Sequence, residues 1–185
     1  MELVAEPATN MKQPVDTRKP DGIVDYLALG LTTFGVGYIP GAPGTYGSAI
    51  AVAIYLATGS SITASGFSPA SYQAIISLSL LVFCLTGIWA SDRATSLLGN
   101  EDPNAVVVDE LMGQFVTFCF VPFGIGWPFI LAGFLLFRLF DIWKPYPIDD
   151  LQGLPGGIGI CADDIVAGVY AGICLSIVYA FTLWI

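Results

Sequence analysis

Two long apolar stretches, at residues 72–91 and 165–185, constrain most strongly what this chain can fold into. Each reaches the roughly 20 residues that an α-helix needs to cross the hydrocarbon core of a bilayer. Shorter apolar stretches lie at about 23–38, 48–58, 111–121 and 125–140. None of them alternates between apolar and polar residues as a half-buried strand does. The pattern predicts an all-α protein, a membrane-embedded bundle of about five to six helices, some of them short or re-entrant.

The scarcity of charge supports a membrane protein. Hydrophobic residues make up 55% of the chain and charged residues 11%, whereas about a quarter of a typical soluble domain is charged. A soluble, unusually apolar bundle with a large oligomer interface is the alternative. We expect one domain at residues 23–185, after a flexible polar tail at residues 1–22 that lacks the apolar core of a signal peptide.

The kinds of charged and sulfur-containing residues exclude several functions. The net charge is −9, from 15 acidic and 6 basic residues, so the chain lacks the basic surface that nucleic acids require. There is no histidine, which excludes histidine general bases, phosphohistidine intermediates and histidine-ligated zinc. The four cysteines are far apart and form no CxxC pair, which favours free thiols and a site facing the reducing cytosol.

The connecting segments fall into two kinds. Three are charged or glycine-rich (39–47, 92–110 and 141–164), and two carry no charge (59–71 and 122–128). If the five stretches from 48 onward cross a bilayer in alternation, the first three segments emerge on one side and the other two on the opposite side. Arg93, Arg138 and Lys144 then lie on the first side, which the positive-inside rule assigns to the cytoplasm.

Two acidic pairs, Asp109–Glu110 and Asp163–Asp164, each precede an apolar stretch on that same side. Their ordinary interpretation is capping and first-turn stabilisation of a helix by its dipole. Because clustered carboxylates repel one another, a divalent cation is the functional interpretation. Ligands that offer only oxygen favour Mg²⁺ or Mn²⁺ over zinc.

Basic residues stand out in the segment FRLFDIWKPYPIDD at 137–150. If a helix continues to Pro145, Arg138, Asp141 and Lys144 are three residues apart and lie close together on its surface. They form either an interfacial salt bridge, with Lys144 extending to the headgroups, or a cationic clamp for a phosphate beside an acidic metal ligand. Asp149 and Asp150 follow the prolines, and we interpret them as solvated loop residues.

The glycine-rich segment PGAPGTYGS at 40–48 precedes another apolar stretch. Backbone N–H groups of such a turn can bind phosphate oxygens, with Gly44, Thr45 and Ser48 as candidates. The lysine of a P-loop is absent, so nucleotide binding is not supported. An ordinary turn in which Thr45 or Ser48 caps the following helix is the alternative.

Four segments resemble the phosphatidylglycerophosphatase A family: GYIPGAPGTYGS, VVVDELMGQ, FRLFDIWKPYPI and GGIGICADDIVAGVYA, in the family's order between residues 37 and 171. The resemblance implies a helical, Mg²⁺-dependent, multi-pass enzyme of the bacterial cytoplasmic (inner) membrane. Its expected reaction is hydrolysis of phosphatidylglycerophosphate to phosphatidylglycerol and inorganic phosphate, in phospholipid biosynthesis. The family's acidic motifs fall on these residues of this chain: Asp109, Glu110, Asp141, Asp163 and Asp164.

The residues and the resemblance together give one site hypothesis. The five acidic residues are expected to hold Mg²⁺, or Mn²⁺, and to act in catalysis, with either water or an aspartate as nucleophile. The expected phosphate-binding groups are Arg138, Lys144, Gly44, Thr45 and Ser48. Two other functions stay open, a related lipid phosphotransferase and a transporter or scaffold. Charges at the ends of the apolar stretches, rather than at their middles, favour a site at the membrane surface. No oligomeric state is predicted.

Overall fold

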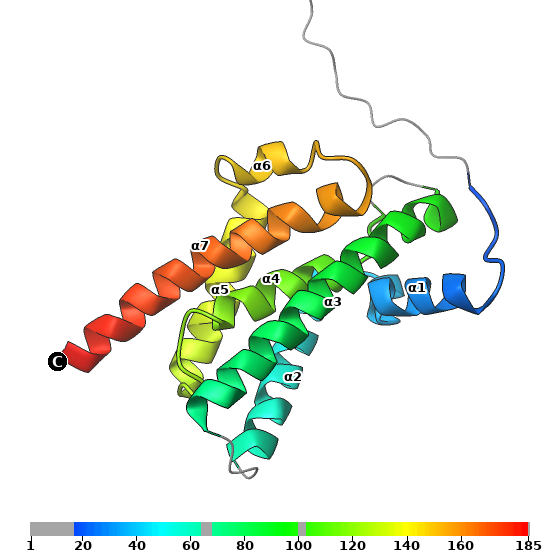
Figure 1. Ribbon diagram of the computed structural model, residues 1–185. Helices are drawn as coiled ribbons and strands as arrows, with labels where there is room; N and C mark the ends of the chain where they lie inside the picture. Colours follow the sequence, from blue (N-terminus) through cyan, green and yellow to red (C-terminus); the bar gives the residue numbers. More distant parts are fainter. Residues whose placement is uncertain (1–16, 64–67, 100–102, 185) are drawn as a thin grey trace, which may run out of the picture.

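The computed structural model describes residues 17–63, 68–99 and 103–184 (Figure 1). Within these residues the chain is entirely helical, which confirms the predicted fold class. The elements are α1 (Ile23–Thr33), the 3-10 turn η1 (Val36–Tyr38), α2 (Pro43–Thr63), α3 (Pro69–Leu98), α4 (Val108–Phe118), α5 (Trp127–Trp143), α6 (Ile148–Leu151) and α7 (Gly156–Trp184).

The two stretches predicted to be long enough for a membrane crossing form two long helices. Gln73–Leu98 of α3 and Gly156–Trp184 of α7 are both long and apolar enough to cross a bilayer. The stretch expected at 111–121 instead forms α4, whose 11 residues extend only about 16 Å along the helix axis. It lies inside the bundle, where Val108, Leu111 and Met112 are fully buried.

The fold is organised by the packing of α4 against α7, the most extensive helix pair in the structure. The two helices are in backbone contact at Gly113 and Gly168, because a Cβ at Gly168 would lie 2.3 Å from the carbonyl oxygen of Gly113. Only glycine permits so close an approach. Thr117 strengthens the contact, since its hydroxyl donates to the carbonyl oxygens of Gly113 and Gly168 at 3.0 and 3.3 Å.

Several helix boundaries differ from the expectation. The predicted connecting segments at 92–110 and 141–164 are shorter, because α3 continues to Leu98, α5 ends at Trp143 and α7 begins at Gly156. The prediction that Asp163 and Asp164 open the last helix, or cap it, was therefore wrong. The three glycines closest before them, Gly156, Gly157 and Gly159, are helical rather than loop residues. Gly157 lies against α3, where a Cβ would come within 2.0 Å of the Ile88 carbonyl oxygen.

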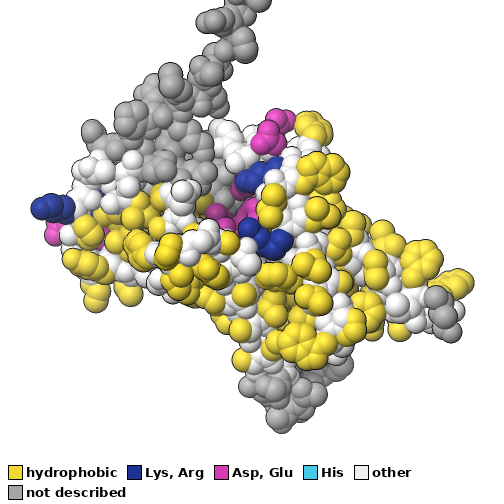
Figure 2. Space-filling model, turned by 180° about the vertical axis from the view of Figure 1, so that it is seen from behind, with side chains coloured by type: hydrophobic (Ala, Val, Ile, Leu, Met, Phe, Trp, Pro, Cys, Tyr) yellow, Lys and Arg dark blue, Asp and Glu magenta, His cyan; other side chains and the backbone are white. Residues whose placement is uncertain are grey.

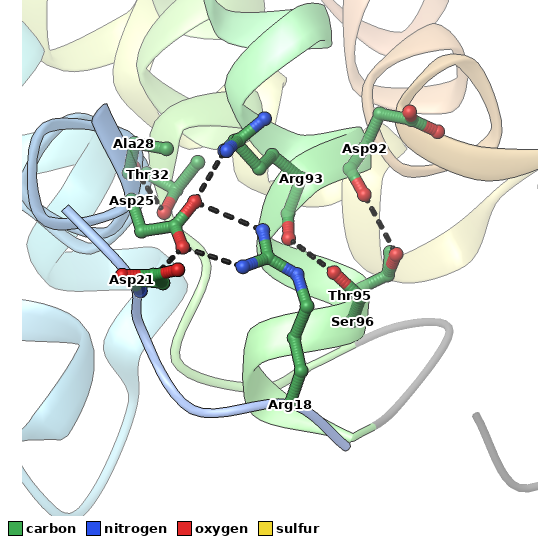
Figure 3. A network of polar contacts seen from close by, with 9 residues as sticks. All are labelled: Arg18, Asp21, Asp25, Ala28, Thr32, Asp92, Arg93, Thr95 and Ser96. Carbon is green, nitrogen blue, oxygen red and sulfur yellow. Dashed lines mark hydrogen bonds and ion pairs between the residues drawn. The ribbon is translucent and has the colours of Figure 1, made fainter. Parts of the chain in front are cut away.

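The stretch at 23–38 forms α1 and η1, and its polar side faces the protein. Asp25 of α1 is fully buried and pairs with Arg18 at 2.5 Å and with Arg93 of α3 (Figure 3). The Arg18 guanidinium, followed by the backbone N–H of Asp21, holds the pKa of Asp25 well below its usual range. Arg18 belongs to the segment expected to be a flexible tail, of which residues 1–16 lie outside the described residues. This ion-pair network attaches α1 to the end of α3.

Much of the exterior is apolar. Large side chains on the outer faces of three helices are about half exposed or more, including Leu78, Leu81 and Leu85 of α3, Leu131, Leu135 and Ile142 of α5, and Ile177 and Phe181 of α7. Figure 2 shows hydrophobic side chains over most of one face, with acidic and basic side chains gathered together in a hollow. The sharp separation of the two kinds of surface marks the hollow as the candidate site.

Candidate active site

A cavity of about 810 Å³ opens at the hollow. Its walls come from the segment that opens α2, the end of α3, the residues before α4, the first turn of α4, the end of α5, residues 152–156 and the first turns of α7. Segments far apart in the sequence therefore meet here. All five acidic residues predicted for the site line this cavity: Asp109, Glu110, Asp141, Asp163 and Asp164.

The crossing of α4 and α7 explains why the two acidic pairs come together. Asp109 and Glu110 lie in the first turn of α4, about one turn from Gly113. Asp164 lies about one turn from Gly168. Because the helices touch at these glycines, the acidic side chains one turn away are brought face to face. One carboxylate oxygen from each of Asp109, Glu110 and Asp164 lies within 4.8 Å of the others.

These carboxylates lack enough hydrogen-bond donors. Among the described residues, Asp109 Oδ1, Glu110 Oε2 and Asp163 Oδ1 are buried and have no hydrogen-bond partner. Burial, followed by the neighbouring Glu110 charge, raises the pKa of Asp109 well above its usual value, and burial also raises that of Glu110. Buried anionic oxygens without donors are unfavourable unless a cation or a proton satisfies them. Oxygens this close together suit the coordination of Mg²⁺, whose ligands lie at about 2.0–2.1 Å.

Both basic residues of the predicted clamp pair with carboxylates. Lys144 Nζ lies 2.6 Å from Asp163 Oδ2, and Arg138 Nη1 lies 2.5 Å from Asp141 Oδ2. Lys144 is the residue after α5 and has a left-handed backbone, with φ 47°, so the helix ends before it. The condition on which the predicted helical spacing depended, a helix that continues to Pro145, is not met, because α5 ends at Trp143; Asp141 and Lys144 nevertheless line the same cavity. Lys144 lines the cavity, whereas Arg138 does not.

The glycine-rich segment is only partly placed as expected. Helix α2 begins at Pro43, so Thr45 and Ser48 are helical rather than caps. Ser48 is fully buried and its hydroxyl donates to the carbonyl oxygen of Gly44 at 2.9 Å. Neither Thr45 nor Ser48 lines the cavity, but Gly44 does. Of the three phosphate-binding candidates in this segment, only Gly44 is in a position to meet a ligand in the cavity.

Part of the cavity lining was not predicted from the sequence. It consists of Thr95 at the end of α3, Asn104 before α4 and residues 152–156 (QGLPG). The glycines of QGLPGG resemble those of the segment at 40–48, and this resemblance could have identified residues 152–156 as candidates. Asp149 and Asp150 are exposed, as predicted, although they lie on the short helix α6 rather than in a loop.

Replacing Gly44 with alanine is expected to disturb the site without unfolding the protein. The added Cβ would lie 2.1 Å from Glu110 Oε1 and 2.9 Å from Arg138 Nη1. Both atoms end flexible side chains, so they can move, but Glu110 must leave its place. Displacement of a reacting group by about 1 Å can cost about 10²-fold in rate. We expect kcat/KM of the reaction at this site to fall at least about tenfold with little change in Tm.

Gly30→Ala is the matched control for that variant. Gly30 is also helical, and a Cβ there would meet nothing within 4 Å. It should leave the kinetics unchanged and slightly raise Tm, because alanine favours a helix over glycine by about 1 kcal/mol. If Gly44→Ala has wild-type kinetics, Glu110 does not take part in the reaction.

Comparisons with known proteins agree on one family. The sequence model of the family described as phosphatidylglycerophosphatase A matches residues 29–179. A Haemophilus influenzae protein named phosphatidylglycerophosphatase A is 35% identical over 162 residues, 87% of this chain and 90% of that protein. An Escherichia coli protein of the same name is 37% identical over 145 residues, 77% of this chain and 76% of that protein.

A third relative carries a different name. A Bacteroides thetaiotaomicron protein with the provisional name phosphatidylinositol-3-phosphatase is 35% identical over 150 residues, 79% of this chain and 89% of that protein. No solved structure matches the chain. The names of the three relatives share a phosphatase acting on a phosphorylated lipid, and they differ in the lipid.

Proposed function

Because the chain belongs to the phosphatidylglycerophosphatase A family, we propose that it hydrolyses the phosphomonoester of phosphatidylglycerophosphate to give phosphatidylglycerol and inorganic phosphate. The observation that carries the proposal is the single cavity in which five carboxylates and Lys144 meet beside a largely apolar exterior. Such a cavity suits a substrate with a highly charged end and a hydrocarbon end.

We further propose that the reaction depends on Mg²⁺. Asp109, Glu110 and Asp164 would hold the ion, because their oxygens are close together and two of them have buried, unpartnered oxygens. Asp141 and Asp163 would complete the acidic wall. When bound, the cation would supply positive charge to neutralise the phosphoryl oxygens in the transition state.

The basic residues have separate roles in this proposal. Lys144 lines the cavity beside Asp163 and binds a phosphate oxygen. Arg138 lies behind the cavity wall and holds Asp141 through its ion pair. The first turns of α2 and α7 add backbone N–H groups, whose partial positive charge favours a phosphate. A carboxylate of the acidic wall accepts the proton of the attacking water, or an aspartate attacks the phosphorus, displaces the lipid alcohol and forms a phospho-aspartate, which water then hydrolyses to release phosphate.

We place the protein in the bacterial cytoplasmic membrane as a multi-pass protein, with the cavity toward the cytoplasm. Support comes from the two helices that are long and apolar enough to cross and from the exposed apolar outer faces of α3, α5 and α7. Trp143 and Tyr146, which are 67% and 82% exposed, lie near the cavity-lining residue Lys144. Aromatic side chains of this kind are enriched at the headgroup level of a membrane.

A panel of substrates tests the function. Purified protein in detergent would be given phosphatidylglycerophosphate, phosphatidylinositol 3-phosphate, phosphatidic acid and a soluble phosphomonoester, and phosphate release would be measured. We expect the highest kcat/KM with phosphatidylglycerophosphate. A preference for phosphatidylinositol 3-phosphate would favour the activity named for the Bacteroides relative. Transfer of phosphate to another lipid, without release, would indicate a phosphotransferase, and no turnover of any lipid would refute the proposal.

A further inference from the structure

Gln114 is a buried polar residue to which the proposed mechanism gives no role. Its side chain is on α4 and is fully buried. Neither its carboxamide oxygen nor its carboxamide nitrogen has a hydrogen-bond partner among the described residues. Leaving a buried amide without partners is costly, so native proteins nearly always satisfy such a group with protein, water or ligand. A ligand in the cavity would not by itself satisfy the amide, because Gln114 does not line that cavity.

The position of Gln114 relates it to Glu110. The two residues are four apart on α4, so they lie on one face of the helix, one turn from each other. Glu110 lines the cavity, and its Oε2 is buried without a hydrogen-bond partner in the described part of the chain. Gln114 therefore lies one turn deeper in the bundle than a carboxylate that itself needs a donor.

Arg138 of α5 is a neighbour of Glu110. Glu110 Oε1 and Arg138 Nη1 both lie within 3 Å of the point where a Gly44 Cβ would stand, so these two side chains are neighbours. One residue away along each helix, Gly113 of α4 packs against Phe137 of α5. Gln114 and Arg138 thus both flank the contact between α4 and α5. The Nε atom of Arg138 is also buried and has no partner among the described residues.

The hydrogen-bonding capacities of these groups are complementary. An ionised carboxylate only accepts, a guanidinium only donates, and a carboxamide does both. Resting on the function proposed above, we propose that Gln114 is a positioning residue that joins Glu110 to Arg138 when the site is loaded. Its Nε2 donates to Glu110 Oε2, and its Oε1 accepts from Arg138 Nε. The reverse orientation is excluded, because it would pair two donors and two acceptors.

Gln114→Met tests this role, because methionine has nearly the same shape and cannot make either hydrogen bond. In metal-free protein the substitution removes an unsatisfied amide, so Tm in excess chelator should equal or exceed that of the wild type. In the metal-bound enzyme the substitution removes the two hydrogen bonds that are proposed to join Glu110 to Arg138. Loss of a partner that orients a metal ligand typically lowers metal affinity or activity by about 10–100-fold. We expect falls of that size in kcat/KM for phosphatidylglycerophosphate and in affinity for Mn²⁺, measured by electron paramagnetic resonance.

Thr117→Val is the matched control on the same helix. Thr117 is as buried as Gln114, but its hydroxyl is already hydrogen-bonded to the backbones of α4 and α7. Its isosteric replacement should show the opposite pattern, a lower Tm with unchanged kinetics per folded molecule. Gln114→Leu serves as a second variant if the methionine variant does not fold.

Two results would overturn the inference. One is a Gln114→Met protein with wild-type kcat/KM and wild-type Mn²⁺ affinity. The other is a Tm in chelator clearly below the wild-type value, which would mean that the amide already has a partner in the metal-free protein. Wild-type protein that hydrolyses no lipid phosphate would instead remove the proposed function, and Tm and Mn²⁺ affinity would still decide the role of Gln114.

Discussion

Asp109→Asn is expected to lower kcat/KM for phosphatidylglycerophosphate by at least about 10²–10³-fold, the range seen when one preorganised electrostatic group is lost from an active site. Asparagine keeps the shape of the side chain and removes its charge. Asp109 is a buried carboxylate whose pKa is raised by burial and by Glu110. Replacement by a neutral amide should therefore leave Tm unchanged or higher, because the ionised form of the side chain is unfavourable at this buried position.

Asp150→Asn is the control for that loss. Asp150 is exposed on α6 and lies outside the cavity, and the same chemical change there should alter neither kcat/KM nor Tm. Circular dichroism melting and phosphate release would be measured on both proteins side by side. Wild-type turnover in Asp109→Asn would exclude this residue from the site, and a large fall in Tm would mean that its role is structural.

Removal of divalent cations is expected to abolish turnover, and added Mg²⁺ is expected to restore it. The buried carboxylates of Asp109 and Glu110 have oxygens that no donor in the described chain satisfies, and repulsion among them disfavours binding of a phosphate until a cation is present. Since burial raises both pKa values, the cation must displace protons. Its affinity should rise with pH, by a measurable factor between about pH 6 and about pH 8.

Titration calorimetry at the two pH values measures this affinity, and phosphate release in excess chelator measures the dependence. The Asp109→Asn protein provides the control, because it should bind Mg²⁺ more weakly at both pH values. Full activity in excess chelator would exclude a metal-dependent reaction. An affinity that falls as pH rises would contradict the assignment of these carboxylates as ligands.

The sequence was informative where a property depends on neighbouring residues. Hydropathy alone located the two long helices α3 and α7, because length and apolar character are local. The alternation of charged and uncharged segments predicted one shared face for these residues, and the structure brings the following six of them to one cavity: Asp109, Glu110, Asp141, Lys144, Asp163 and Asp164. Their catalytic and metal-binding roles stay predictions.

The incorrect sequence predictions concern features that depend on contacts between residues far apart in the chain. The start of α7 was missed because GGIGI has the composition of a loop, and only its packing against α3 at Ile88 explains why glycines are helical there. The partner of Lys144 is Asp163, 19 residues away, and no spacing rule links them. Thr45 and Ser48 were assigned to phosphate because a glycine-rich turn was expected, whereas the helix begins before them.

The backbone contact between Gly113 and Gly168 also limits how such a site can vary. Because the two helices cannot move closer and are already in contact, the spacing between their carboxylates is set by main-chain geometry. Natural variation or design that aims at a larger or smaller ion cannot adjust this spacing by repacking the crossing. The length of the acidic side chains is the remaining variable, so Asp109→Glu, Glu110→Asp and Asp164→Glu are the accessible changes that would alter the ion preference of the proposed site.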